Sequence, residues 1–199
     1  MVQFLAKKTA LYLAKDDETA DVEVLTYGCY LIYQEWFVRV IMLLAALPFG
    51  LFFHVLAGII SFTLVRRCAM GAHARHPTIC LFTTVVVVYG PAVLAEQFSL
   101  GFMLVPFVGL YIFGIVSLLL YAPAETDVKK VPDPRERKRL KIESIVWLSV
   151  CFLAASVLQN WFAAIAFVAA ASAALACCFV HPWMYSINGF DPVTREERE

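Results

Sequence analysis

The segment GAHARHPTIC, residues 71–80, holds a histidine, His73, seven residues before a cysteine, Cys80. The thiolate is the reactive form of cysteine, and a neighbouring histidine can generate it by accepting the thiol proton. These two residue types therefore indicate a nucleophile and its general base. Cys80 and His73 are the candidate catalytic residues of the chain.

The spacing of the two residues restricts how they could meet. Seven residues along one helix would separate them by about 10 Å, whereas proton transfer needs a contact of roughly 2.6–3.2 Å. Pro77 lies between them, and proline is favoured in the first turn of a helix. A helix that begins at Pro77 puts Cys80 in its first turn, where the helix dipole favours a thiolate. We therefore predict a loop from Gly71 that folds His73 back onto a helix start.

Other interpretations of the segment remain open from its residues alone. His73, His76 and Cys80 are residue types that bind zinc, although the sequence offers no fourth ligand. His76 could replace His73 as the base, but its position before Pro77 favours an extended backbone that turns it away. The segment could also be an ordinary anchoring loop that precedes an inert thiol.

The composition predicts the elements that hold this segment. Hydrophobic residues make up 61% of the 199 positions and charged residues 16%, against about 45–50% and about 25% in globular domains. A water-soluble chain of this length cannot bury so much apolar sequence. Apolar segments long enough to cross a bilayer lie near residues 26–47, 48–65, 78–97, 100–121, 143–159 and 161–183. We predict an all-α polytopic membrane protein with about six transmembrane helices, and a single membrane-embedded domain over residues 1–199.

The basic residues predict the orientation of these segments. They gather before the first segment, after the second, after the fourth and after the sixth, whereas the connections near Pro48, Ser99 and Asn160 contain no Lys or Arg. Lys and Arg are retained on the cytoplasmic side. Both termini, the candidate catalytic loop 66–77 and the basic loop 122–142 are therefore expected in the cytoplasm. Residues 1–24 should include an amphipathic interfacial helix, and residues 184–199 a cytoplasmic tail.

Two short motifs give the chain a family resemblance. Basic residues end the second apolar segment, and Gly71-Ala72-His73-Ala74 and Cys80 follow. The segment 121–126, YAPAET, then precedes a second basic stretch, and Tyr27-Gly28 stands at the start of the first apolar segment. In order and spacing these features resemble the accessory gene regulator B family over almost the whole chain. Met70 departs from the pattern, because the family often has a second glycine there.

The resemblance implies a function. Members of this family are bacterial membrane-embedded cysteine endopeptidases that mature quorum-sensing peptides. Cys80 would attack a peptide carbonyl of a small precursor, with His73 as general base, release the C-terminal segment and hold the remainder as a thioester. A cysteine of the precursor would then close a thiolactone ring. The chemistry needs no metal or cofactor. The implied partners are the precursor, the lipid bilayer and a second copy of the chain in a homodimer, and not nucleic acid.

Further residues match motif positions or carry charge near the expected site. Arg66 or Arg67, and Gly71, match the family pattern, in roles that the sequence leaves open. Gln34 and Glu35 lie in the first apolar segment, where polar groups are candidates for function. They could orient His73 or contact substrate, or they could simply lie near the lipid headgroups.

Charge in the second basic loop admits two interpretations. Lys129 and Lys130 begin a cluster that extends to Lys141. Such a cluster commonly holds a loop against anionic lipid. It could also bind the acidic C-terminal segment of the family's precursors.

Two other functions compete with the peptidase. A peptide exporter predicts polar groups spread through several membrane segments, but this chain concentrates them at one edge. A noncatalytic membrane scaffold predicts that Cys80→Ser has no effect.

Overall fold

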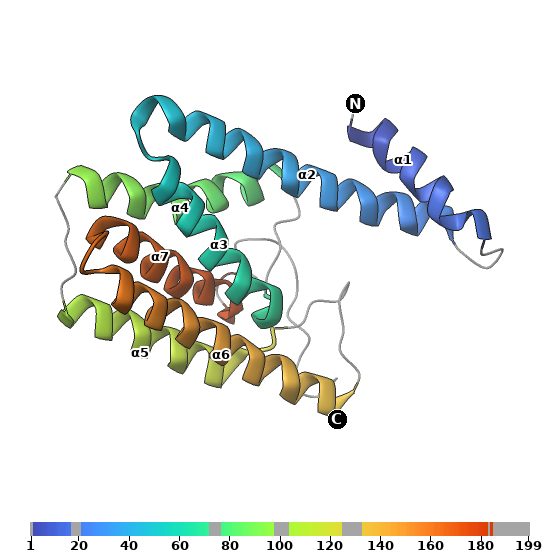
Figure 1. The fold of residues 1–199 in the computed structure, drawn as a ribbon. Coiled ribbons are helices and arrows are strands. Elements are labelled where there is room, and N and C mark those ends of the chain that lie inside the picture. The colour runs from blue at the N-terminus through green and yellow to red at the C-terminus, as the bar shows by residue number, and fades with distance from the viewer. Residues whose placement is uncertain are drawn as a thin grey trace. The chain divides into compact units, whose positions relative to one another are not determined.

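The computed structural model describes residues 2–16, 21–71, 77–97, 104–124, 133–182 and 184. Throughout these ranges the elements are helices, and the only β-type pairing is an isolated bridge between Met70 and Ala124 (Figure 1). The elements are α1 (Val2–Leu13), η1 (Ala14–Asp16), α2 (Val22–Ala46), η2 (Leu47–Phe49), α3 (Phe52–Ala69), α4 (Pro77–Gln97), α5 (Leu104–Tyr121), α6 (Pro134–Leu158), α7 (Ala163–Ala176) and η3 (Cys177–Val180). The predicted all-α class is confirmed.

Several of these helices have the length and apolar character of membrane spans. Four stretches in the described part of the chain qualify fully, and two more apolar helices there are shorter. The four are Val22–Phe49, Phe52–Ala69, Pro134–Leu158 and Ala163–Val180, and the two are Phe82–Gln97 and Phe107–Tyr121. Each predicted apolar segment overlaps one of them. The chain is a polytopic membrane protein, while the count of six spans and the cytoplasmic position of the termini stay predictions.

The chain divides into two compact units, Met1–Ala45 and Ala46–Glu199. In the first unit, the hydroxyls of Thr9 on α1 and Tyr33 on α2 lie 2.9 Å apart and join the two helices. The predicted N-terminal helix is confirmed over Val2–Leu13. The boundary of that region at residue 24 was placed too late, because the Asp21 carboxylate accepts hydrogen bonds from the first backbone N–H groups of α2.

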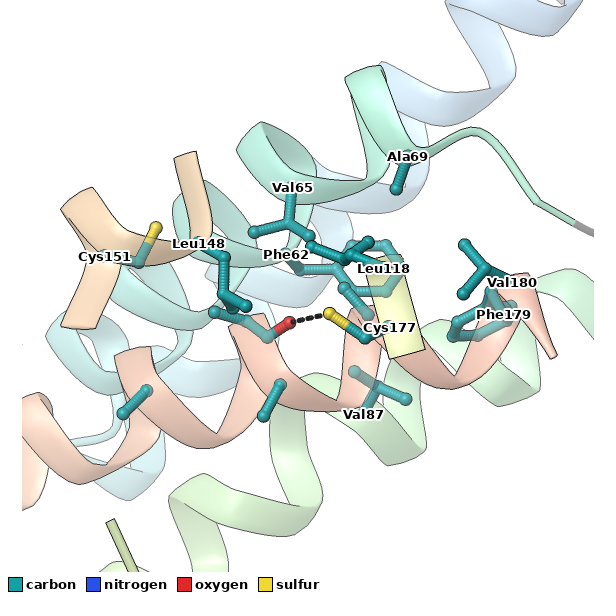
Figure 2. Packing of buried hydrophobic residues seen from close by; sticks show 14 of the residues in the cluster. Phe62, Val65, Ala69, Val87, Leu118, Leu148, Cys151, Cys177, Phe179 and Val180 are labelled. Carbon is teal, nitrogen blue, oxygen red and sulfur yellow. Dashed lines mark hydrogen bonds between the residues drawn. The ribbon is translucent and has the colours of Figure 1, made fainter. Parts of the chain in front are cut away.

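The second unit is built around α7, which packs against α3, α4, α5 and α6. Its alanines from Ala166 to Ala176 are buried among these neighbours, so small side chains allow several helices to approach one axis. Figure 2 shows the apolar cluster that results, with side chains from α3, α4, α5, α6, α7 and η3. The small-residue face of α7 is therefore an internal packing surface of this chain.

One close approach depends on Gly58 of α3. A Cβ atom at this position would lie 3.0 Å from the Ser172 hydroxyl oxygen and 3.1 Å from a methyl carbon of Val88. Ser172 is itself held in place, because its hydroxyl donates to the Val87 carbonyl at 3.2 Å. Helices α3, α4 and α7 meet here without room for a larger residue.

Replacing Gly58 by valine should therefore destabilise the second unit. Inserting methyl groups into a packed core costs about 1–3 kcal/mol, so the melting temperature of the detergent-solubilised protein should fall by several degrees. Gly109→Val on α5 is the matched control, because no atom lies within 4 Å of its Cβ position. Equal melting temperatures for the two variants would contradict the packing described for Gly58.

The basic loop predicted over residues 122–142 is wrong in its second half. Helix α6 begins at Pro134, nine residues before the predicted segment 143–159. The Asp133 carboxylate accepts the backbone N–H of Arg135 at 2.9 Å, and proline occupies the first helical position. Hydropathy located only the apolar part of the helix, whereas Arg, Lys and Glu are also good helix formers.

The second and last apolar segments are also shifted from their predicted bounds. Helix α3 starts after Gly50, whose left-handed φ of +70° ends η2, and it includes Arg66 and Arg67 at its far end. Helix α7 starts at Ala163 and gives way at Cys177 to the short 3-10 turn η3. Local backbone geometry determines where both helices begin and end, and a prediction from hydropathy does not detect it.

Candidate functional site

Helix α4 begins at Pro77, so the predicted helix start is confirmed and Cys80 belongs to its first turn. The side chain of Cys80 lies outside what the structure describes, and so do His73, His76, Lys129 and Lys130. The pairing of Cys80 with His73 and the metal-binding alternative therefore stay predictions. The structure describes the backbone on either side of the segment that contains His73, up to Gly71 and from Pro77 onward.

Chain connectivity limits the direction in which α4 can run relative to α3. Gly58 of α3 lies against Val88 of α4; Ala69 follows Gly58 by eleven residues, and Val88 follows Pro77 by eleven. If the helices were parallel, Ala69 and Pro77 would be about 33 Å apart along the axes. The eight steps between them reach roughly 29 Å at most. The helices are therefore not parallel, and the chain must turn back between Ala69 and Pro77.

The chain that leaves α3 is hydrogen-bonded to the chain that leaves α5. The Gly71 N–H donates to the Ala124 carbonyl at 2.9 Å, and the Ala124 N–H donates to the Ala69 carbonyl at 3.1 Å. Together these bonds form the isolated bridge opposite Met70. The two segments on which the family resemblance was recognised, near residues 71 and 121–124, are thus joined in space.

Gly71 has a conformation and a neighbour that exclude a side chain. Its φ is +104°, a region that L residues rarely adopt, and a Cβ atom would lie 2.5 Å from the Phe179 carbonyl oxygen. Met70 before it also has a positive φ, +60°, with ψ −131°. A non-glycine residue held in such a sparsely populated region costs of order 1–3 kcal/mol. This backbone explains why glycine suits the position of Met70, where the chain departs from the family pattern.

The structure distinguishes the two arginines that matched one motif position. The guanidinium carbon of Arg66 lies 4.2 Å from the ring centroid of Phe179 and 5.9 Å from that of Phe62. The two rings meet edge to face at 5.7 Å. Arg67, in contrast, is exposed. Arg66 is therefore the arginine that is built into the packing at this end of α3.

Other polar contacts join the same ends of the helices. The Cys68 thiol contacts the Glu143 carboxylate of α6 at 3.7 Å, and Glu143 accepts a hydrogen bond from Arg139 at 2.6 Å. His181 lies 2.9 Å from the Ser117 hydroxyl of α5. The Cys68–Glu143 and Ser117–His181 contacts were not predicted, because no local spacing in the sequence relates residues so far apart.

The polar residues of the first apolar segment lie in the first unit. Glu35 and Arg39 are four residues apart, which puts them on one face of α2, and they form an ion pair. The guanidinium of Arg39 also lies 5.7 Å from the ring centroid of Trp36. Gln34 is half-buried and Glu35 exposed. A role for either residue toward His73 or substrate stays a prediction.

Comparison with known proteins identifies the family. The model of the family described as accessory gene regulator B matches residues 3–180, nearly the whole chain. The chain belongs to the accessory gene regulator B family. The resemblance predicted from the motifs is thereby confirmed, and with it an involvement in quorum sensing of the accessory gene regulator type.

Several curated members of the accessory gene regulator B family are similar to the chain at low identity. A putative AgrB-like protein 2 of Clostridium perfringens is 24% identical over 74% of this chain and 71% of its own length. The accessory gene regulator protein B of Staphylococcus lugdunensis is 29% identical over 74% of this chain and 77% of its own. No solved structure matches the chain significantly. The matched range 3–180 includes Gly71, Cys80 and Phe179, and thus all of the helix ends described above.

Proposed function

We propose that this member of the accessory gene regulator B family is a membrane-embedded cysteine endopeptidase that cleaves a precursor peptide and promotes its cyclisation. One observation carries the proposal: α4 begins at Pro77, which puts Cys80 in the first turn of a helix. Unpaired backbone N–H groups and the positive end of the helix dipole stabilise a thiolate there. The proline also ends any continuous helix between Cys80 and His73, so a loop can bring the two together.

The proposed reaction is two successive acyl transfers. His73 accepts the thiol proton, and the Cys80 thiolate attacks a backbone carbonyl of the precursor. The peptide C–N bond breaks, and the imidazolium returns the proton to the leaving amine of the C-terminal segment. The thiol of a precursor cysteine then attacks the thioester, which forms the thiolactone and regenerates Cys80. Exchange of one thioester for another is nearly isoenergetic, and exclusion of water favours ring closure over hydrolysis.

The surroundings of the site follow from the same proposal. The distribution of basic residues favours a cytoplasmic active site in a bacterial cell membrane, where a newly synthesised precursor would arrive. Lys129 and Lys130 would bind the acidic C-terminal segment of the precursor, and Gln34 or Glu35 would support substrate or base. A homodimer remains part of the proposal.

The proposal is tested by the mass of the product. The purified protein, in vesicles of phosphatidylcholine and phosphatidylglycerol, is incubated with the precursor peptide encoded by the neighbouring gene. We expect a free C-terminal segment and a second product lighter by one water than the linear N-terminal fragment. Changing the precursor's ring-forming cysteine to alanine should remove the lighter product. Intact precursor that crosses the vesicle membrane uncleaved would instead support the exporter.

A further inference from the structure

Phe179 was not singled out by the sequence, yet it contacts two motif residues. It lies in η3, directly after α7, and is 5% exposed. Figure 2 shows it with Ala69 and Val180 at one end of the apolar cluster. This is the end at which the chain leaves α3.

Phe179 holds the last turn of α3 through its ring. Phe62 and Arg66 are four residues apart, so they share one face of the helix. The ring of Phe179 contacts both residues: it meets the Phe62 ring edge to face, with 5.7 Å between the centroids, and the guanidinium carbon of Arg66 lies 4.2 Å from the Phe179 centroid. An arginine over an aromatic face is attracted by the negative face of the ring, and the attraction is stronger where water is excluded.

The backbone of Phe179 also restricts the chain that follows α3. Its carbonyl oxygen approaches Gly71 so closely that a Cβ atom there would be only 2.5 Å away. On its other side, Gly71 donates its N–H to Ala124 at 2.9 Å. The last described residue before His73 is therefore held between η3 and the segment that follows α5.

Only residues 72–76 connect Gly71 to Pro77, the first residue of α4. His73 is the second residue of this connection. With so few residues, the direction in which the chain leaves Gly71 restricts where the imidazole can go, because each residue contributes only two soft backbone dihedrals. A displacement of about 1 Å at a catalytic group can lower the rate on the order of a hundredfold.

We propose that Phe179 is a positioning residue, which fixes Arg66 and Gly71 so that the short connection presents His73 to Cys80. This inference rests on the proposed function, since it assumes that His73 activates the Cys80 thiol. It also gives roles to Arg66 and Gly71, which the sequence left open. Arg66 anchors the end of α3 on the Phe179 ring, and Gly71 leaves room for the Phe179 carbonyl oxygen.

The test is the reactivity of Cys80 toward iodoacetamide as a function of pH. The full-length protein is alkylated in vesicles, and modification is followed on the peptide that contains Cys80, which separates it from the other five cysteines. In Phe179→Leu the reactivity near pH 7 should fall about tenfold, toward the profile of His73→Ala, because the thiolate loses its base. Phe179→Tyr, which keeps the ring, should retain the wild-type profile.

Phe152→Leu is the matched control. Phe152 is 4% exposed in the same cluster, but its ring contacts Phe107 and Tyr111 rather than Arg66. It should lower the melting temperature and leave the Cys80 profile unchanged. A wild-type profile in Phe179→Leu, or an equal shift in Phe152→Leu, would overturn the positioning role while leaving the proposed function intact. An unchanged profile in His73→Ala would overturn the proposed catalytic pair and this inference with it.

Discussion

Cys80→Ala is expected to abolish cleavage of the precursor. Alanine leaves no nucleophile to form the thioester, and removal of the nucleophile from a catalytic unit of this kind costs on the order of 10⁴- to 10⁶-fold in turnover. The measurement is the initial rate of C-terminal segment release from the precursor in reconstituted vesicles. Alanine is a good helix former at this place in the first turn of α4, so the melting temperature should change little.

Cys151→Ala provides the control for loss of a thiol. Cys151 lies in α6 and is 5% exposed within the apolar cluster. Its replacement should lower stability slightly, through the small cavity it leaves, and turnover should stay close to that of the wild type. Undiminished cleavage by Cys80→Ala would contradict the role of Cys80 as nucleophile, because another group would then have to attack the peptide bond.

Gly71→Ala should be the second most severe change. Alanine at this position would have to adopt a φ of +104°, and its Cβ atom would lie 2.5 Å from the Phe179 carbonyl oxygen. Either residue 71 or η3 therefore has to move. We expect kcat for cleavage to fall about a hundredfold or more, because the connection that contains His73 starts from a displaced residue. The measurement is kcat and KM for precursor cleavage, with the melting temperature of the same sample.

Gly50→Ala separates backbone strain from displacement. Gly50 also has a positive φ, +70°, but nothing lies within 4 Å of its Cβ position. This variant should lose about 1 kcal/mol or more of stability, as expected for a strained φ, and should keep its turnover. If Gly71→Ala cleaves like the wild type, or if Gly50→Ala loses turnover to the same extent, the close contact with Phe179 has no part in positioning the site.

Features governed by local rules were predictable from the sequence. Pro77 correctly predicted the start of α4. Asp133 and Pro134 would have marked the start of α6, since together they form a standard helix N-terminus. The prediction failed there because it followed hydropathy, which treats a charged helical turn as a loop.

Features that depend on packing were not predictable. The contacts of Phe179 with Arg66 and Gly71 join η3 to the end of α3, and no periodicity relates these segments. The Cys68–Glu143 contact is of the same kind, because it links two helices that are distant in the sequence. The choice between Arg66 and Arg67 also depended on packing, since two adjacent arginines point to different faces of a helix.

The most direct test of the account is detection of the acyl-enzyme. A precursor whose ring-forming cysteine is replaced by alanine cannot accept the acyl group, so the thioester should accumulate in the reconstituted protein before slow hydrolysis. After an acid quench, peptide mapping by mass spectrometry should find the N-terminal fragment of the precursor attached to Cys80, in a linkage that hydroxylamine cleaves. Cleavage of this precursor without any adduct on Cys80, or with an adduct on another residue, would contradict the account.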